Sequence, residues 1–174
     1  MHIANILASG ADCMKVRDFK LDDTRDVVEI LKLNDQYSPL VEGPEAVKRV
    51  SECRAAVYLV AVRYGKVVGV VKGVYDGSRA LIHQMSVHPK YQKRGIGSAL
   101  VREMASRFKA MGAPTVSVTA STRSQGFFEK AGFKVLPQVV FMLAFSIDEL
   151  IDKGGSRFQK REEASRVRTR TSKT

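Results

Sequence analysis

The chain has 174 residues, a length that suits one domain with a sizeable hydrophobic core. Hydrophobic residues make up 44% of it and charged residues 27%, which is ordinary for a globular protein, and no apolar run approaches the roughly 20 residues that cross a bilayer. The two cysteines, Cys13 and Cys53, exclude a disulfide framework and a cysteine-based metal cluster. The formal net charge of +11 favours attraction to polyanions but does not bear on the fold. Because a signal-peptide pattern is missing as well, we expect a cytoplasmic protein without a bound metal or a membrane partner.

The first third of the chain is typical of a strand followed by two helices. Residues 1–13 match no element, and we expect them to be a frayed extension before a domain that covers 14–152. Apolar residues at helical spacing predict two buried helix faces, made of Val27, Val28, Ile30, Leu31 and Leu33, and of Val47, Val50 and Cys53. The predicted elements are a strand over 15–19, a helix that begins at Asp22 or Asp23, a loop over 35–43, and a helix that begins at Pro44.

Three antiparallel strands are expected in the middle of the chain. Gly65 marks a turn between the first two, and Asp76-Gly77 is a strong hairpin signal between the second and the third. The predicted strands cover 57–62, 66–75 and 80–88.

A helix and a further strand follow. Apolar residues between Ser98 and Met111 fall on one helical face, and alternation over 116–120 predicts a strand. Because strand, helix and strand follow one another, we expect a parallel β-α-β crossover. The remaining predicted elements are a helix over 122–131 and two last strands over 133–136 and 139–145.

The end of the chain is basic. Residues 153–174 carry eight Lys or Arg against two Glu, a net charge of +6, and few apolar residues. We expect a disordered tail, which either only improves solubility or also binds polyanions weakly and non-specifically.

The stretch that connects the third strand of the middle group to the long helix has the composition of an anion site. The first backbone N–H groups of a helix lack intrahelical partners, and the helix dipole adds positive potential there. Gly95 and Gly97 allow a close approach to the backbone, while Lys90, Lys93 and Arg94 supply positive charge. Neither a Walker loop nor a three-glycine dinucleotide fingerprint is present. The pattern therefore predicts a pyrophosphate site with a basic rim, although a tight turn with solvated basic residues is the alternative.

Two motifs resemble the GCN5-related N-acetyltransferase (GNAT) family. Gln92-x-x-Gly95-x-Gly97 resembles its acyl-CoA-binding loop, and the segment from Phe127 to Phe133 resembles its later Tyr-Glu-Lys-x-Gly-Phe helix. The resemblance covers roughly 14–146 and implies an α/β (α+β) fold. In that fold a mixed, mostly antiparallel sheet is flanked by helices and contains a central β-α-β acyl-CoA-binding unit. It also implies an N-acetyltransferase that uses acetyl-CoA and a primary amine as its substrates.

The resemblance assigns cofactor contacts residue by residue. Backbone amides of the loop would hold the pyrophosphate, and those of the strand before it would hold the pantetheine arm and polarise the thioester carbonyl. The residues so assigned are Met85, Ser86, Val87, Gln92, Lys93, Arg94, Gly95, Ile96, Gly97, Ser98 and Phe128.

His83 is the candidate general base. The family often places a Glu on this strand, whereas here an imidazole, which titrates near 6.5, lies two residues before Met85 and by alternation on the same face. A structural histidine and an ordered water as proton relay are the alternatives.

The general acid departs from the family pattern. The position of the family's Tyr holds Phe128, which has no proton to give. This difference leaves a second function open, a catalytically weak acyl-CoA-binding module that regulates or recruits a partner. A third, a nucleic-acid-binding protein, depends on the basic tail alone.

The sequence does not identify the acceptor, and a protein N-terminus, a lysine side chain, a free amino acid and a small polyamine all remain open. Asp35, Tyr37, Glu42 and Glu45 lie where the family shapes its acceptor site, although a solvated loop surface is the simpler interpretation. A homodimer through an exposed last strand is a further hypothesis.

Overall fold

The computed structural model describes residues 14–139, 147 and 151. The chain falls into two units, Met1–Lys134 and Val135–Thr174. In the second unit, a hydrogen bond of 3.0 Å from the Val139 N–H to the Leu136 carbonyl closes a turn. All elements that follow belong to the first unit. They are β1 (Lys15–Asp18), a 3-10 turn (Leu21–Asp23), α1 (Thr24–Leu33), α2 (Pro39–Glu42), α3 (Pro44–Glu52), β2 (Ala56–Arg63), β3 (Lys66–Tyr75), β4 (Ala80–Val87), a second 3-10 turn (Pro89–Tyr91), α4 (Ile96–Ala110), β5 (Val116–Val118) and α5 (Thr122–Lys130).

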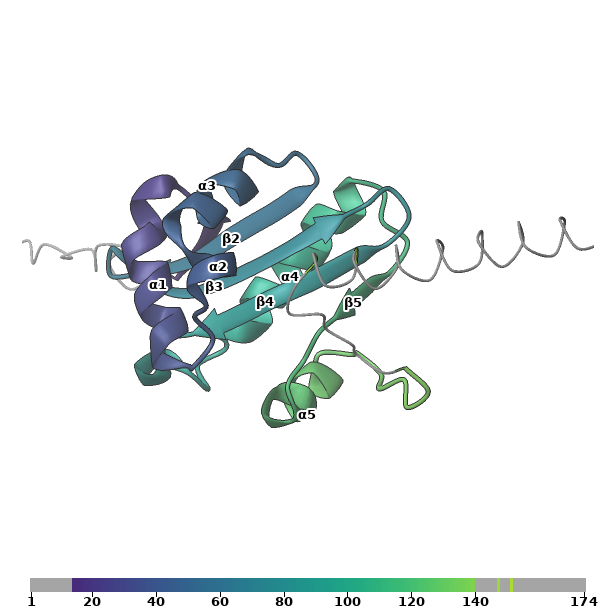
Figure 1. Cartoon of the computed structure of the whole chain (residues 1–174). Helices are drawn as coiled ribbons and strands as arrows, with labels where there is room; N and C mark the ends of the chain where they lie inside the picture. The colour runs from purple at the N-terminus through teal and green to yellow at the C-terminus, as the bar shows by residue number, and fades with distance from the viewer. Residues whose placement is uncertain (1–13, 140–146, 148–150, 152–174) are drawn as a thin grey trace, which may run out of the picture. The chain divides into compact units, whose positions relative to one another are not determined.

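The first unit is built on one sheet with the strand order β1-β2-β3-β4-β5. The strands pair antiparallel except for β4 and β5, which are parallel and joined through α4. Helices α1, α2 and α3 lie on one face of the sheet and α4 lies on the other (Figure 1). The predicted fold class and the parallel crossover are therefore confirmed. No helix in the described residues is long and apolar enough to cross a membrane.

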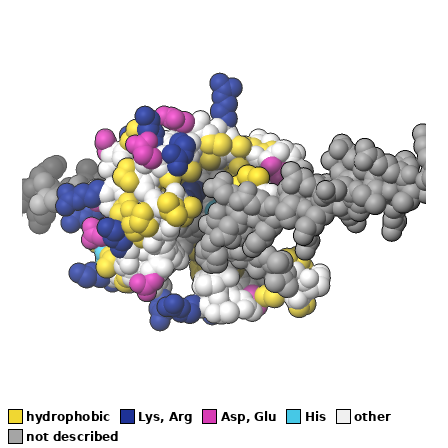
Figure 2. Space-filling view, viewed as in Figure 1, with side chains coloured by type: hydrophobic (Ala, Val, Ile, Leu, Met, Phe, Trp, Pro, Cys, Tyr) yellow, Lys and Arg dark blue, Asp and Glu magenta, His cyan; other side chains and the backbone are white. Residues whose placement is uncertain are grey.

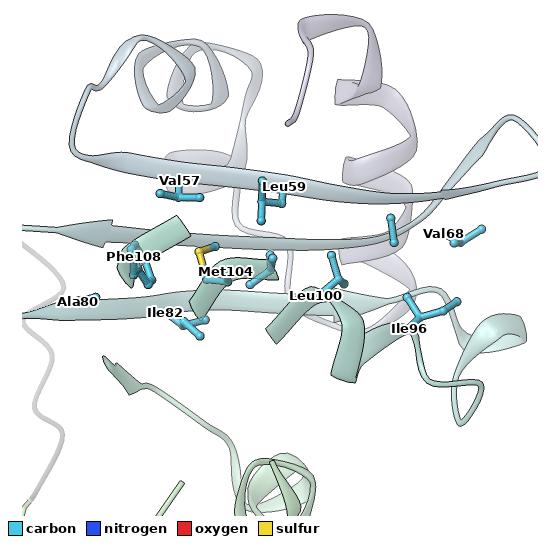
Figure 3. Close-up of a cluster of buried hydrophobic side chains, with 11 residues drawn as sticks. Val57, Leu59, Val68, Ala80, Ile82, Ile96, Leu100, Met104 and Phe108 are labelled. Atoms are coloured by element: carbon cyan, nitrogen blue, oxygen red, sulfur yellow. The ribbon is translucent and has the colours of Figure 1, made fainter. Parts of the chain in front are cut away.

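A hydrophobic core lies on each face of the sheet. The face that carries α4 packs side chains of β2, β3 and β4 against Ile96, Leu100, Met104 and Phe108 (Figure 3). The α4 helix can lie this close because Gly73 has no side chain: a Cβ there would lie 2.5 Å from the Leu81 carbonyl oxygen and 2.8 Å from the Phe108 ring. On the opposite face, Val27, Ile30 and Leu31 of α1 pack against β2 and β3.

Several sequence predictions are wrong in detail. The expected loop over 35–43 contains the short helix α2, since Pro39 suits the first turn of a helix and not its interior. Leu33 is 50% exposed at the end of α1, and Cys53 is exposed just after α3, so neither belongs to a core face. Figure 2 shows hydrophobic side chains among the charged ones on the face that carries α1 and α2.

The expected strand over 133–136 is also wrong. The α5 helix ends in a Schellman motif, in which the N–H groups of Gly132 and Phe133 bond the carbonyls of Glu129 and Phe128. The Phe133 ring lies edge-on to Phe128, 5.5 Å away, and these contacts hold the segment in an irregular conformation. Apart from Val139, the strand predicted over 139–145 lies outside the described residues, as do the N-terminal extension and the tail.

Candidate active site

Strands β4 and β5 separate beyond the middle of the sheet. Their parallel pairing joins Ala80, Leu81 and Ile82 to Val116, Ser117 and Val118, and the Thr119 N–H makes a last bond of 3.3 Å to the Ile82 carbonyl. Beyond Ile82 no described strand pairs with this edge of β4. Within the described part of the chain, the separation leaves an open strand edge that leads toward the start of α4.

Met85, Ser86 and Val87 lie along this open edge. Met85 and Val87 are partly buried and pack against the core that α4 covers, whereas Ser86 is 4% exposed and faces the α1 side. Their side chains are thus packed within the protein, and the edge offers a ligand backbone groups.

A β-bulge interrupts β4 at the beginning of the open edge. Lys72 of β3 is opposite Gln84, but the next residue, Gly73, is opposite Ile82, so His83 is one residue more than the partner strand has. As a result Ile82 and Met85, three residues apart, pack in the same core. The simple alternation on which the expected face of His83 was based therefore does not hold across this bulge.

His83 feels the charges of Lys72 and Glu42, which form an ion pair between β3 and α2. The side chain stays exposed at the bulge. Partial desolvation lowers the pKa of His83, the positive charge of Lys72 lowers it further, and the negative charge of Glu42 opposes both. The imidazole is therefore neutral, and able to accept a proton, at neutral pH.

The start of α4 presents unpaired backbone donors. Gly95 is the N-cap with φ of 79°, and the first intrahelical bond runs from the Ala99 N–H to the Gly95 carbonyl at 3.0 Å. The N–H groups of Ile96, Gly97 and Ser98 consequently have no partner within the helix, and no side chain caps this end. The geometry is that of an anion site.

The loop before α4 adds to this site. Lys93 and Gly95 both have positive φ, at 58° and 79°, while Arg94 between them does not. Such alternation turns successive N–H groups toward one side, as in the backbone concavities that bind anions. The side chains of Lys93 and Arg94 are exposed, so their charges border the helix start.

Gln92 has a structural partner that the sequence did not reveal. Its Nε2 donates to the Val87 carbonyl at 3.0 Å and to Oδ1 of Asn34 at 3.1 Å. Asn34, just after α1, donates from Nδ2 to the Ile30 carbonyl, to Oγ of Ser86 and to the Val87 carbonyl at 2.9, 2.9 and 3.1 Å. These bonds tie α1, the end of β4 and the loop together. The only signal in the sequence was an Asn at a helix end, where this residue type is common.

The α5 helix contacts the start of α4 through an aromatic cluster. The Phe127 ring lies 3.1 to 3.2 Å from the position that a Cβ on Gly97 would take. Phe128 is 5% exposed, with Phe127 and Phe133 edge-on to it at 5.0 and 5.5 Å. Gly97 therefore makes room for a side chain of α5, and the expected position of the general acid holds a buried apolar ring.

A second group of polar residues lies near His83, on the face of the sheet that α1, α2 and α3 cover. Glu42 of α2 accepts two hydrogen bonds from Nζ of Lys72 at 3.0 and 2.9 Å, and both side chains are largely buried. Tyr58 on β2 and Gln84 on β4 lie opposite Lys72 in the sheet register. Of the acidic residues expected near an acceptor, Glu42 alone is buried here, while Asp35 and Glu45 are exposed.

The sequence matches the model of one known protein family. The model of the acetyltransferase (GNAT) family matches residues 27–133, which include both motifs. Among solved structures, a transcriptional regulator from Bacillus halodurans is 23% identical, with a TM-score of 0.65 over 76% of this chain and 100% of that chain.

Two further structures are similar to the same extent. The PaiA N-acetyltransferase from Thermoplasma acidophilum, in complex with coenzyme A, is 17% identical, with a TM-score of 0.65 over 73% of this chain and 93% of that chain. Glucosamine-6-phosphate N-acetyltransferase from Arabidopsis thaliana is 19% identical, with a TM-score of 0.63 over 78% of this chain and 100% of that chain. At these identities the similarity concerns the fold.

Proposed function

Because the chain belongs to the acetyltransferase (GNAT) family, we propose that it transfers the acetyl group of acetyl-CoA to a primary amine, by direct attack in a ternary complex. The observation that carries the proposal is the combination of an uncapped, positively charged helix start with the open edge of β4 that leads to it. A structure of one similar protein contains coenzyme A, which supports the choice of donor.

The residues around Gly95 fit a pyrophosphate. The N–H groups of Ile96, Gly97 and Ser98 are unpaired within α4, and two cationic side chains border them. A Cβ added at Gly95 would have no heavy atom within 4 Å, so the backbone there is open to a ligand. We assign these amides, with Lys93 and Arg94, to the phosphates. Gln92 keeps the loop in place through its side-chain bonds.

The open edge of β4 is assigned to the thioester arm. Acetyl-CoA supplies an activated acyl group when it is bound. The backbone groups of Met85, Ser86 and Val87 would orient that arm, except the Val87 carbonyl, which accepts from Gln92 and Asn34. One N–H of this edge would donate to the carbonyl oxygen on which charge develops. Because their side chains are packed, the backbone is the part of this edge that can reach the arm.

We assign proton removal to His83. An amine attacks only as the free base, so the ammonium form of the acceptor must lose one proton. The neutral imidazole at the bulge accepts it, directly or through one water. The bulge is compatible with this role because the His83 side chain stays exposed there.

Phe128 leaves the departing sulfur without an acid from α5. A thiol with a pKa near 8.5 leaves tolerably as a thiolate, so transfer does not require a Tyr at this position. The same observation favours the second candidate function, an acyl-CoA-binding module with little activity.

One experiment separates the two functions. The full chain is titrated with acetyl-CoA by calorimetry, and thiol release is then measured with a panel of amines. Saturable binding with thiol release that depends on the amine supports the enzyme. Binding without release on any amine would replace it by the regulatory module, and no binding would refute both. Removal of residues 153–174 tests nucleic-acid binding separately, because polyanion binding should disappear while acetyl-CoA binding remains.

A further inference from the structure

The ion pair between Glu42 and Lys72 lies in a costly position. The side chains are only 7% and 12% exposed, and the removal of two charges from water is compensated only when the geometry is good and further hydrogen bonds are made. Here the pair joins a four-residue helix to the middle strand of the sheet. An apolar contact would hold α2 as well. We therefore looked for a role of the charges themselves.

Two buried polar atoms beside the pair lack partners. Tyr58 is 7% exposed, and neither its hydroxyl nor Oε1 of Gln84 has a hydrogen-bond partner among the described residues. Burial raises the pKa of Tyr58, with a smaller contribution from Glu42, so the hydroxyl remains protonated and able to donate. Buried polar atoms without partners are rare in folded proteins. Tyr58, Lys72 and Gln84 form one row across β2, β3 and β4, and this row can donate to and accept from a ligand.

The charges next to this row would limit which kinds of amine could bind there. Lys72 neutralises Glu42, and the nearby Asp23 is held by two bonds of 2.6 and 2.8 Å from Arg17. A simple cationic amine would add an unbalanced positive charge next to Lys72, and a simple anion would add an unbalanced negative charge next to Glu42. A molecule that carries one positive and one negative charge would leave no unbalanced charge next to Lys72 or Glu42.

We propose that the acceptor is an amine that also carries a carboxylate, an amino acid in the broad sense, and that it is recognised by an exchange of partners. Its carboxylate takes the place of Glu42 on Lys72, and its ammonium pairs with Glu42. Every charge remains paired, and the ammonium lies near His83, whose charged neighbours are these two residues. This inference depends on the proposed function, because it names the substrate of the same site.

The test compares acceptors that differ only in the carboxylate. Thiol release from acetyl-CoA is measured with a panel of amino acids and with the carboxamide of each. The parent should prefer the best acid to its amide by about tenfold or more in kcat/KM, as expected for the loss of a charge-assisted hydrogen bond. Lys72→Gln should abolish this preference, while Lys72→Arg should keep much of it. Lys66→Gln, on the same strand but exposed, is the matched control and should leave the preference unchanged.

Glu42→Gln gives a second readout if Lys72→Gln does not fold. With its partner neutral, Lys72 should bind carboxylates that carry no amine, and their inhibition constants should fall about tenfold. A parent that favours amides or polyamines, or a preference for acids that survives in Lys72→Gln, would overturn the proposal while acetyl transfer itself stands. Acetyl-CoA binding without thiol release on any amine would refute the proposed function, and this inference with it.

Discussion

Asn34→Ala probes the connection between α1 and the loop before α4, to which we assign coenzyme A binding. The variant loses three donated bonds, to Ile30, Ser86 and Val87, and one accepted bond from Gln92. A neutral hydrogen bond contributes about 1 kcal/mol net, and water or the remaining partners compensate part of the loss, so we expect the free energy of unfolding to fall by about 2 kcal/mol. Because the bonds also position the open edge of β4 and the loop, affinity for coenzyme A should fall about tenfold, or about 1.4 kcal/mol.

Urea unfolding measures the first quantity and calorimetric titration the second. Gln36→Ala is the control, since the Gln36 side chain is exposed and, among the described residues, Gln36 bonds through its backbone N–H to Leu31. A double-mutant cycle combines Asn34→Ala with Gln92→Ala, because Nε2 of Gln92 lies 3.1 Å from Oδ1 of Asn34. The two substitutions should show a coupling of about 0.5 to 1 kcal/mol in coenzyme A affinity. If Asn34→Ala is destabilised but binds coenzyme A as the parent does, the bonds support the fold alone and the positioning argument is wrong.

Three further predictions follow from the packing and charges. Desolvation and the charge of Lys72 lower the pKa of His83 from its usual 6.5, so the acid limb of the pH profile of kcat/KM should lie below pH 6.5. Lys72→Gln should move it to higher pH and Glu42→Gln to lower pH, and a limb that neither variant moves excludes His83 as the base. Phe108→Ala empties a fully buried site and should cost about 3 to 5 kcal/mol of unfolding free energy in urea, where a loss under 1 kcal/mol would contradict the described core. Phe128→Tyr should raise kcat if protonation of the leaving thiol limits turnover, and an unchanged kcat with intact folding would show that it does not.

The order of the elements could be predicted because it depends on local signals. Apolar periodicity located α1 and α4, although α4 begins at Ile96 and not at the expected Ser98, and the Asp76-Gly77 turn located the hairpin. The parallel pairing of β4 with β5 followed from chain connectivity alone.

The details that govern the site could not be predicted, because they depend on contacts between distant segments. A bulge at His83 follows from the fit of β4 to β3, not from the alternation within β4. Asn34 contacts residues 52 and 53 positions away. Glu42 looked like a solvated loop residue until α2 placed it over Lys72. Family resemblance suggested the donor, but the row of Tyr58, Lys72 and Gln84, to which we assign the acceptor, is a property of the folded chain.

The central claim is that backbone amides at the start of α4 bind the donor. The most direct test is a titration of the ¹⁵N-labelled full chain with coenzyme A, followed by the amide resonances of α4 in NMR spectra. We predict saturable shifts that are largest for Ile96, Gly97 and Ser98 and small for the last turn, around Phe108 and Ala110. Saturable binding that leaves the first three amides unchanged, or that shifts the last turn most, would contradict the account.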